Sequence, residues 1–209
     1  AWLLLAEPVD PGCWDEVEAR VARWTAAELV ARATLLGLPV SRLGEVGAPR
    51  TDGATELAAA RSGSISADPS RARRNARSAD RGLVVDLSAL WAGPLAASIL
   101  ADAGARVVKV ESTGRPDGTR FGPPAFFDRL NSGKECGALD LAADEGRGEL
   151  RRLVDRADVV VSASRPRALA SLGLYPAVWV ATGEGTRVWL SVTGYGASGP
   201  GAGRVAFGD

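Results

Sequence analysis

The sequence predicts an α/β fold, in which a mostly parallel sheet is covered by helices on both faces and follows a small helical segment. Val84, Val85 and Leu87 form a short apolar run typical of a strand buried on both faces. Pro94 suits the first turn of a helix, apolar residues recur at helical spacing from Leu95, and Gly104 ends that helix. Residues 106–111 then resume as a strand. We expect the two strands to be parallel and joined by this crossover helix.

Strands and helices also alternate through the rest of residues 82–209. Strands are expected at 137–141, 159–161 and 188–193, and helices at 144–156 and 166–182. The last helical region is expected to break at Gly173 and Pro176. Residues 112–135 are rich in glycine and proline and are expected to form a long loop, of the kind that is often functional. The alternation predicts a mostly parallel sheet.

Residues 1–48 are expected to form the helical segment. Apolar residues at helical spacing predict a helix within 11–24. Thr25 lies three residues before Glu28, which is the pattern of a capping box and predicts the start of a second helix. Residues 49–81 are rich in Pro, Gly, Ser, Asp and Arg, and we expect them to be a flexible linker.

The composition excludes some classes of function. The 209 residues are 46% hydrophobic and 24% charged, as in an ordinary globular protein. The net charge is zero, so nucleic-acid binding is not expected, and the apolar runs are too short to span a membrane. Histidine is absent, so this chain alone cannot build a site that requires imidazole, and no metal site is expected.

The two cysteines, Cys13 and Cys136, stand alone. Their positions fit neither a metal-binding pattern nor a disulfide framework, which favours a reducing, cytoplasmic location. The chain has no methionine and ends without a stop signal, so we expect it to be part of a longer protein.

The segment at residues 194–199 fits the pattern G-x-G-x-x-G and follows an expected strand. Pro200, Gly201 and Gly203 come next, so no helix is expected to begin there and present its N-terminus to a pyrophosphate. We therefore reject NAD or FAD binding. The glycines would instead let the backbone approach a ligand closely.

Six motifs together resemble the class III CoA transferases, the group of formyl-CoA transferase and carnitine CoA transferase. The motifs are AGPLAASILADAGARVVKVE at 92–111, DGTR at 117–120, NSGK at 131–134, ALDL at 138–141, ADVVVS at 157–162 and SVTGYGASGP at 191–200. The resemblance covers roughly residues 82–200. It implies a Rossmann-like sheet and an enzyme that moves CoA between an acyl-CoA and a free carboxylate. It also implies an aspartyl-CoA intermediate, a homodimer, and CoA as a substrate rather than a permanently bound cofactor.

The resemblance also implies a set of CoA-binding residues. They are Ala89, Leu90, Trp91, Ala92, Arg120, Lys134 and Leu139. The first four form the turn after the first strand, at the N-terminus of a helix, where free N–H groups favour phosphates. Arg120 and Lys134 are the cations expected near those phosphates. Trp91 is bulkier than the usual residue at its position, and Asp140 is expected to cap a turn or helix.

Two departures from the family pattern concern the catalyst and the coenzyme. Where the family reads E-N-F-x-P-G, this chain has residues 162–167 without the amide or the aromatic ring. In the family, the nucleophilic aspartate lies a few tens of residues beyond the segment matching Gly199 and Pro200. We therefore expect it outside these 209 residues, assign no catalytic residue, and expect the chain alone to be inactive. Gly208 falls where related racemases have histidine, which favours a transferase. An alternative is a non-catalytic CoA-binding or structural module, a degenerate half of a fused protein.

Overall fold

The computed structural model describes residues 10, 12–45, 82–183 and 187–206. These residues divide into two compact units. A helical unit holds the described residues up to 45 together with residues 204–206. An α/β unit holds the described residues from 82 to 203. The expected linker at 49–81 lies outside the described residues.

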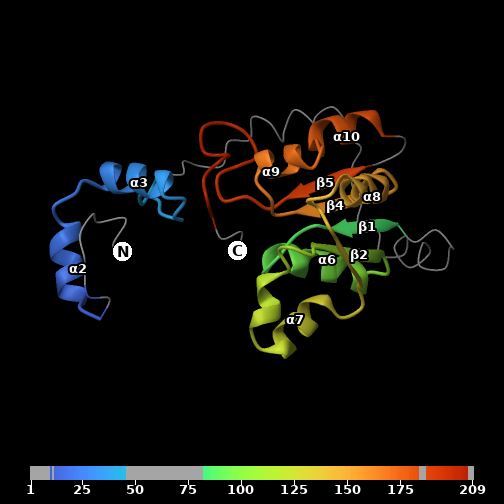
Figure 1. The fold of residues 1–209 in the computed structure, drawn as a ribbon, viewed down its shortest axis with the longest axis horizontal. Coiled ribbons are helices and arrows are strands. Elements are labelled where there is room, and N and C mark those ends of the chain that lie inside the picture. The colour runs from blue at the N-terminus through green and yellow to red at the C-terminus, as the bar shows by residue number, and fades with distance from the viewer. Residues whose placement is uncertain (1–9, 11, 46–81, 184–186, 207–209) are drawn as a thin grey trace. The chain divides into compact units, whose positions relative to one another are not determined.

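The helical unit contains α2 (Trp14–Val21) and α3 (Ala26–Leu35), shown in blue in Figure 1. The predicted capping box is present at the start of α3. The backbone N–H of Glu28 donates to the Thr25 hydroxyl over 3.2 Å, and the Thr25 N–H donates to the Glu28 carboxylate over 2.9 Å. Each bond satisfies a donor that the first helical turn leaves unpaired, and the predicted start of α3 is confirmed.

A five-stranded parallel sheet forms the centre of the α/β unit. Its strands are β1 (Leu83–Asp86), β2 (Arg106–Ser112), β3 (Glu135–Leu139), β4 (Val159–Ser162) and β5 (Val188–Ser191). Their order is β3-β2-β1-β4-β5, and every neighbouring pair is parallel. The prediction of a mostly parallel sheet is confirmed. The strand order reverses beside β1, so the loop after β1 lies where such sheets usually bind ligands.

Helices cover both faces of this sheet, as the sequence predicts (Figure 1). The helices of this unit are α6 (Ala92–Asp102), α7 (Pro124–Asn131), α8 (Asp144–Asp155), α9 (Pro166–Ser171) and α10 (Pro176–Thr182). Val84 packs with Ala97 of α6 on one face, whereas Val85 packs with Leu150 of α8 and Trp179 of α10 on the other. Successive residues of a strand point to opposite faces, so one short apolar run supplies both cores.

The prediction of one long loop over residues 112–135 is wrong. This stretch contains a short 3₁₀ helix, η1 (Gly118–Phe121), followed by α7. Pro124 occupies the first turn of α7, where its missing N–H costs nothing, and Leu130 is buried. Proline and glycine here mark the ends of short elements and do not prevent helix formation.

Two further boundaries differ in detail from the predicted ones. Strand β3 covers residues 135–139, two residues earlier than expected, because it pairs with β2 from Val108 opposite Glu135 onward. The strand ends before Asp140, whose carboxylate accepts a hydrogen bond from the Ala142 N–H over 3.0 Å. This bond confirms the predicted turn-capping role of Asp140. Residues 192–206 form turns and bends, and no helix begins after the glycine-rich segment.

Candidate functional site

The turn from Leu87 to Trp91 joins the carboxyl end of β1 to the N-terminus of α6. Ala89, Leu90 and Trp91 are exposed to solvent. Trp91 is the N-cap residue of α6, and no side chain caps the first N–H groups of the helix. These N–H groups and the helix dipole make the position favourable for an anion. The structure therefore brings Ala89, Leu90, Trp91 and Ala92 together at the place that the sequence predicts.

Leu90 has an unusual backbone conformation. Its φ is +70°, and it is the one non-glycine residue with positive φ in the part of the chain that the structure describes. A left-handed conformation is disfavoured for leucine by about 1–2 kcal/mol, so it needs support from its surroundings. The Leu90 N–H donates to Oδ1 of Asp117 over 3.1 Å. Asp117, 27 positions later in the chain, thus supports the centre of the turn.

A close approach of α6 also shapes the turn. A Cβ atom on Gly93 would lie 2.3 Å from both Cβ and Oγ of Ser88, so only glycine fits at this position. Ser88 is in turn held by Asp86, because its N–H donates to Oδ1 of Asp86 over 3.0 Å and its hydroxyl donates to the same oxygen. The end of β1 and the start of α6 are therefore locked together around Ser88.

Lys134 is fully buried beneath this turn. Its Nζ lies 2.9 Å from Oδ2 of Asp86, and neither side chain is exposed to solvent. The same Nζ donates to the Pro94 carbonyl over 2.7 Å and to Oδ1 of Asn131 over 3.0 Å. Burial lowers the pKa of Lys134, and the Asp86 carboxylate opposes that shift. All three N–H groups of the ammonium have protein acceptors, so Lys134 connects α6, α7 and β1.

Lys109 and Asp117 form a second buried ion pair on the other side of the turn. Nζ of Lys109 lies 2.9 Å from Oδ2 of Asp117, with both side chains fully buried, and it also donates to the Ser88 carbonyl over 2.9 Å. Oδ1 of Asp117 accepts from the N–H and the hydroxyl of Thr119, at 3.0 and 2.8 Å, as well as from Leu90. Burial alone would raise the pKa of Asp117. The hydrogen bonds from Lys109, Thr119 and Leu90 lower it overall.

Arg120 forms a third ion pair with the buried Glu111, and only the arginine side of this pair is open to solvent. Its Nε lies 3.0 Å from each oxygen of Glu111, and its Nη2 lies 2.5 Å from Oε2. The guanidinium stacks over the Phe127 ring at 3.9 Å, and the side chain is 40% exposed. The hydrogen bond from Arg120 lowers the pKa of Glu111. Nη1 of Arg120 has no hydrogen-bond partner among the described residues, so one side of the guanidinium can contact an anion.

Of the other predicted CoA-binding residues, Trp91 lies at the turn and Leu139 lies far from it. Trp91 packs edge-on against Phe126 of α7, with 5.3 Å between the ring centroids. Leu139 ends β3, which β2 separates from β1, and it packs against the core on the α8 side. The structure thus groups Trp91 with the turn, and it places Leu139 two strands away.

Sequence reasoning missed Lys109 and Asp117 as residues that shape the site. Lys109 interrupts the valine-rich middle of β2, between Val108 and Val110. A charged residue at such a position is rarely buried unless it is paired, so it could have indicated a buried partner. Nothing in the local sequence identifies that partner as Asp117.

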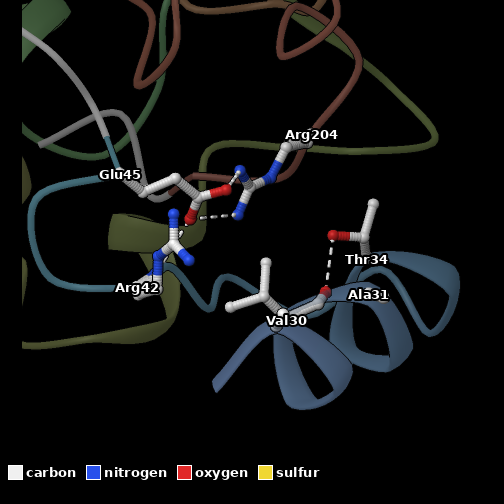
Figure 2. A pocket seen from close by; sticks show the side chains of 7 residues that line it. Val30, Ala31, Thr34, Arg42, Glu45 and Arg204 are labelled. Carbon is white, nitrogen blue, oxygen red and sulfur yellow. Dashed lines mark hydrogen bonds and ion pairs between the residues drawn. The ribbon is translucent and has the colours of Figure 1, made fainter. Parts of the chain in front are cut away.

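A separate small pocket lies in the helical unit (Figure 2). It is lined by Ala27, Val30, Ala31, Thr34, Arg42, Glu45 and Arg204. The Glu45 carboxylate accepts from the Arg42 N–H over 2.8 Å and from Nη1 of Arg204 over 2.7 Å. The Thr34 hydroxyl donates to the Val30 carbonyl over 2.8 Å. The polar groups of this pocket thus bond to one another, which gives no indication of a ligand.

The described residues contain no cluster of histidine, cysteine or acidic side chains that could hold a metal ion. Cys13 and Cys136 are both free and exposed. None of the described helices is long and apolar enough to cross a bilayer. The turn after β1 and the three ion pairs around it are therefore the main candidate site of the described residues.

Residues 82–209 match the family CoA-transferase family III. The chain belongs to this family. The succinate–glutarate CoA-transferase of Agrobacterium fabrum is 38% identical over an alignment 131 positions long, which covers 56% of this chain and 32% of that protein. The α-methylacyl-CoA racemase of Homo sapiens is 39% identical over 117 residues, 56% of this chain and 28% of that protein. The chain thus spans about a third of the length of these relatives.

Solved structures agree with the family and the fold. A CAIB/BAIF family protein from Brucella suis is 35% identical, with a TM-score of 0.54 over 60% of this chain and 36% of that one. A hypothetical protein from Mycobacterium tuberculosis is 34% identical, with the same TM-score and the same coverage. The family resemblance and the α/β fold predicted from the sequence are both confirmed.

Proposed function

We propose that the protein to which this chain belongs transfers CoA between an acyl-CoA and a free carboxylate, and that residues 82–206 bind the coenzyme. Membership in CoA-transferase family III supports CoA transfer in general. Relatives named as CoA-transferases act on several different acids, among them glutarate, D-citramalate and oxalate. This variety leaves the identity of the acyl group open, but each of these enzymes uses a CoA thioester and a carboxylic acid.

The observation that carries the proposal is the uncapped N-terminus of α6 at the point where the strand order reverses. Its N–H groups, with the exposed backbone of Ala89 and Leu90, would hold phosphate or amide oxygens of CoA. Arg120 would add a charge-assisted hydrogen bond through Nη1. In the observed geometry Lys134 would act indirectly, because Asp86, Pro94 and Asn131 accept its three N–H bonds. Direct contacts of CoA with Lys134 and Leu139 remain predictions.

The chemistry we propose is covalent catalysis by an aspartate outside residues 1–200. Its carboxylate would attack the thioester carbonyl and release CoA as a thiolate, which leaves a mixed anhydride. The thiolate would then attack the aspartyl carbonyl, release the first acid and form an aspartyl-CoA thioester. The second acid would take CoA by the same two steps in reverse. Backbone N–H groups around the turn would orient the coenzyme during this exchange.

Two measurements test this function. Calorimetric titration of the 209-residue chain should give weak CoA binding that weakens further as salt is added, because charge-assisted contacts are screened. No binding at millimolar CoA would contradict the assigned site. For the whole protein, incubation with acyl-CoA and a carboxylate, followed by hydroxylamine trapping and mass spectrometry, should give an aspartyl adduct outside residues 1–200. A specific adduct within residues 1–200 would contradict the proposed position of the nucleophile.

A second candidate is racemisation, because a racemase is among the relatives. We favour transfer, since Gly208 stands where the racemases have histidine and the chain contains no histidine at all. Transfer would need no proton abstraction from the α carbon. Incubating the whole protein with a 2-methylacyl-CoA in deuterium oxide should therefore give no exchange at that carbon. Rapid deuterium incorporation would support the racemase instead.

We also propose that the whole protein is a cytoplasmic homodimer. The free, exposed Cys13 and Cys136 are compatible with a reducing compartment. Closed twofold symmetry is the commonest form of assembly for enzymes. Light scattering on the whole protein should give twice the mass of one chain, and a monomer would contradict this proposal.

A further inference from the structure

We propose that Lys109 and Asp117 are positioning residues for the coenzyme, because they hold Leu90 in its left-handed conformation and thereby fix the direction of the turn's N–H groups. This inference rests on the proposed function, in which the turn from Leu87 to Trp91 binds CoA. It adds a role for two residues that touch no ligand themselves.

The contacts of the Lys109–Asp117 pair converge on the backbone of the turn. Lys109 donates to the Ser88 carbonyl over 2.9 Å, and Asp117 accepts the Leu90 N–H over 3.1 Å. The turn is thus held on both sides of Ala89 by two side chains that bond to each other over 2.9 Å. Both side chains are fully buried, so these bonds are shielded from water and their geometry is rigid.

The Lys109–Asp117 pair supports the unusual backbone conformation of Leu90. A leucine rarely adopts positive φ without support, and here the N–H bond to Asp117 supplies it. Gly118 packs closely against the side chain of Leu90. A Cβ atom at Gly118 would lie 3.2 Å from Cδ2 of Leu90. Rotation of Leu90 to an ordinary conformation would turn the following peptide, and with it the N–H of Trp91 at the N-cap of α6.

The other buried pair has a different target. Lys134 and Asp86 bond to Pro94 and Ser88, so they hold α6 against the end of β1 and do not contact Leu90. The direction of the peptide between Leu90 and Trp91 therefore depends on Asp117, which itself depends on Lys109 for its charge partner. We expect the affinity for CoA to follow the state of Asp117 more closely than the overall stability does.

The test is a set of variants in the full 209-residue chain, with CoA affinity measured by calorimetry well below the unfolding temperature. Asp117→Ala removes the acceptor for Leu90, and a lost hydrogen bond to a charged group corresponds to about a tenfold or greater loss of affinity. Thr119→Val is the matched control. It removes one bond to the same oxygen of Asp117 without touching the turn, and it should change affinity by no more than about twofold.

A rescue separates positioning from a merely structural role. Glycine adopts positive φ without strain, so Leu90→Gly combined with Asp117→Ala should recover a large part of the lost affinity. A structural role alone would lower stability in Asp117→Ala, with no rescue of binding by Leu90→Gly. If Asp117→Ala fails to fold, Asp117→Ser takes its place, because its shorter side chain also withdraws Oδ1 from the Leu90 N–H but keeps a polar group. Unchanged CoA affinity in a folded variant that lacks Oδ1 would overturn the inference.

Hydrogen exchange at the Leu90 amide makes the test independent of binding. The amide should be protected in the wild-type chain, exchange faster in Asp117→Ala and stay protected in Thr119→Val. If the wild-type chain binds no CoA, the proposed site fails, and the exchange rates still decide whether Asp117 holds the turn. Equal exchange at Leu90 in the wild-type chain and Asp117→Ala would overturn the positioning role, whatever the result with CoA.

Discussion

Nζ of Lys134 lies 2.9 Å from Oδ2 of Asp86, and both side chains are fully buried at the centre of the α/β unit. Replacing Lys134 by methionine would keep most of its apolar stem and leave the Asp86 carboxylate buried without its charge partner. Removing one member of a buried pair in this way costs about 3–5 kcal/mol. The free energy of unfolding from urea titration should fall by this amount in Lys134→Met.

An exposed ion pair on the same sheet provides the control. Arg106 and Glu135 bond across β2 and β3 at 2.8 Å, but their side chains are 54% and 59% exposed. Arg106→Met should leave the free energy of unfolding nearly unchanged, because water and salt screen such a pair. If Lys134→Met and Arg106→Met lower the free energy of unfolding equally, burial does not strengthen the contribution of the Lys134–Asp86 pair to stability.

Gly93 offers a test of the close approach between α6 and the turn. In Gly93→Ala the new methyl group would collide with Ser88, which cannot move away without losing its bonds to Asp86. Overpacking of this kind costs about 1–3 kcal/mol, and CoA binding should weaken as well because the turn must shift. Thermal unfolding and calorimetric titration would measure the two effects.

The matched control for Gly93→Ala is Gly137→Ala on β3. A Cβ atom at Gly137 would meet no other atom within 4 Å. Alanine is favoured over glycine in a strand by about 0.5–1 kcal/mol, so this variant should be as stable as the wild-type chain or slightly more stable. Similar destabilisation in both variants would argue against the collision with Ser88.

The unit of β1, α6 and β2 could be predicted from the sequence because its signals are local. The apolar run at 84–87, the proline at the start of the helix and Gly104 at its end each act within a few residues. The capping box of Thr25 and Glu28 is local in the same way. Helix α7 was not predicted because the contacts that stabilise it are not local. That helix has only eight residues, and it packs on residues far away in the sequence, among them Trp91.

The position of the turn after β1 could be predicted from the sequence, because the strand before it and the helix after it have local signals. That CoA binds at this turn stays a prediction. The bonding around the turn could not be predicted. The pairing of Lys109 with Asp117, and of Lys134 with Asp86, depends on side chains that meet only in the folded chain. Lys134 illustrates the limit, because a lysine in a glycine-containing motif can be either an exposed phosphate ligand or a buried partner of a carboxylate.

The stability of the α/β unit should fall in acid. The pKa values of Glu111 and Asp117 are both held below their ordinary values of 4.5 and 3.8, for Glu111 chiefly by the hydrogen bond from Arg120. A carboxylate with a lowered pKa in the folded state stabilises the protein fully above its ordinary pKa. That contribution is lost as the pH falls through the lowered value. Urea unfolding measured from neutral pH to below these values should show the decline.

Glu111→Gln provides the comparison for the acid titration. Because one of the two carboxylates is gone, this variant should be less stable at neutral pH and should lose less stability in acid than the wild-type chain. The chain has no histidine, so the loss should be confined to the acidic range and not begin near neutral pH. An equal acid dependence in both proteins would show that Glu111 does not contribute to it.

Arg120 is the cation of the site with an unpaired N–H side, and its replacement by lysine tests its role in CoA binding. Lysine can keep one bond to Glu111 and the positive charge, but it lacks the planar fork that contacts Glu111 and an anion at the same time. We expect Arg120→Lys to weaken CoA binding by about tenfold, the value of one charge-assisted hydrogen bond. Arg129→Lys, an exposed position on α7, should leave CoA affinity unchanged. Calorimetry would measure both. If Arg120→Lys binds CoA as tightly as the wild-type chain does, the guanidinium serves only to pair with Glu111 and to pack on Phe127.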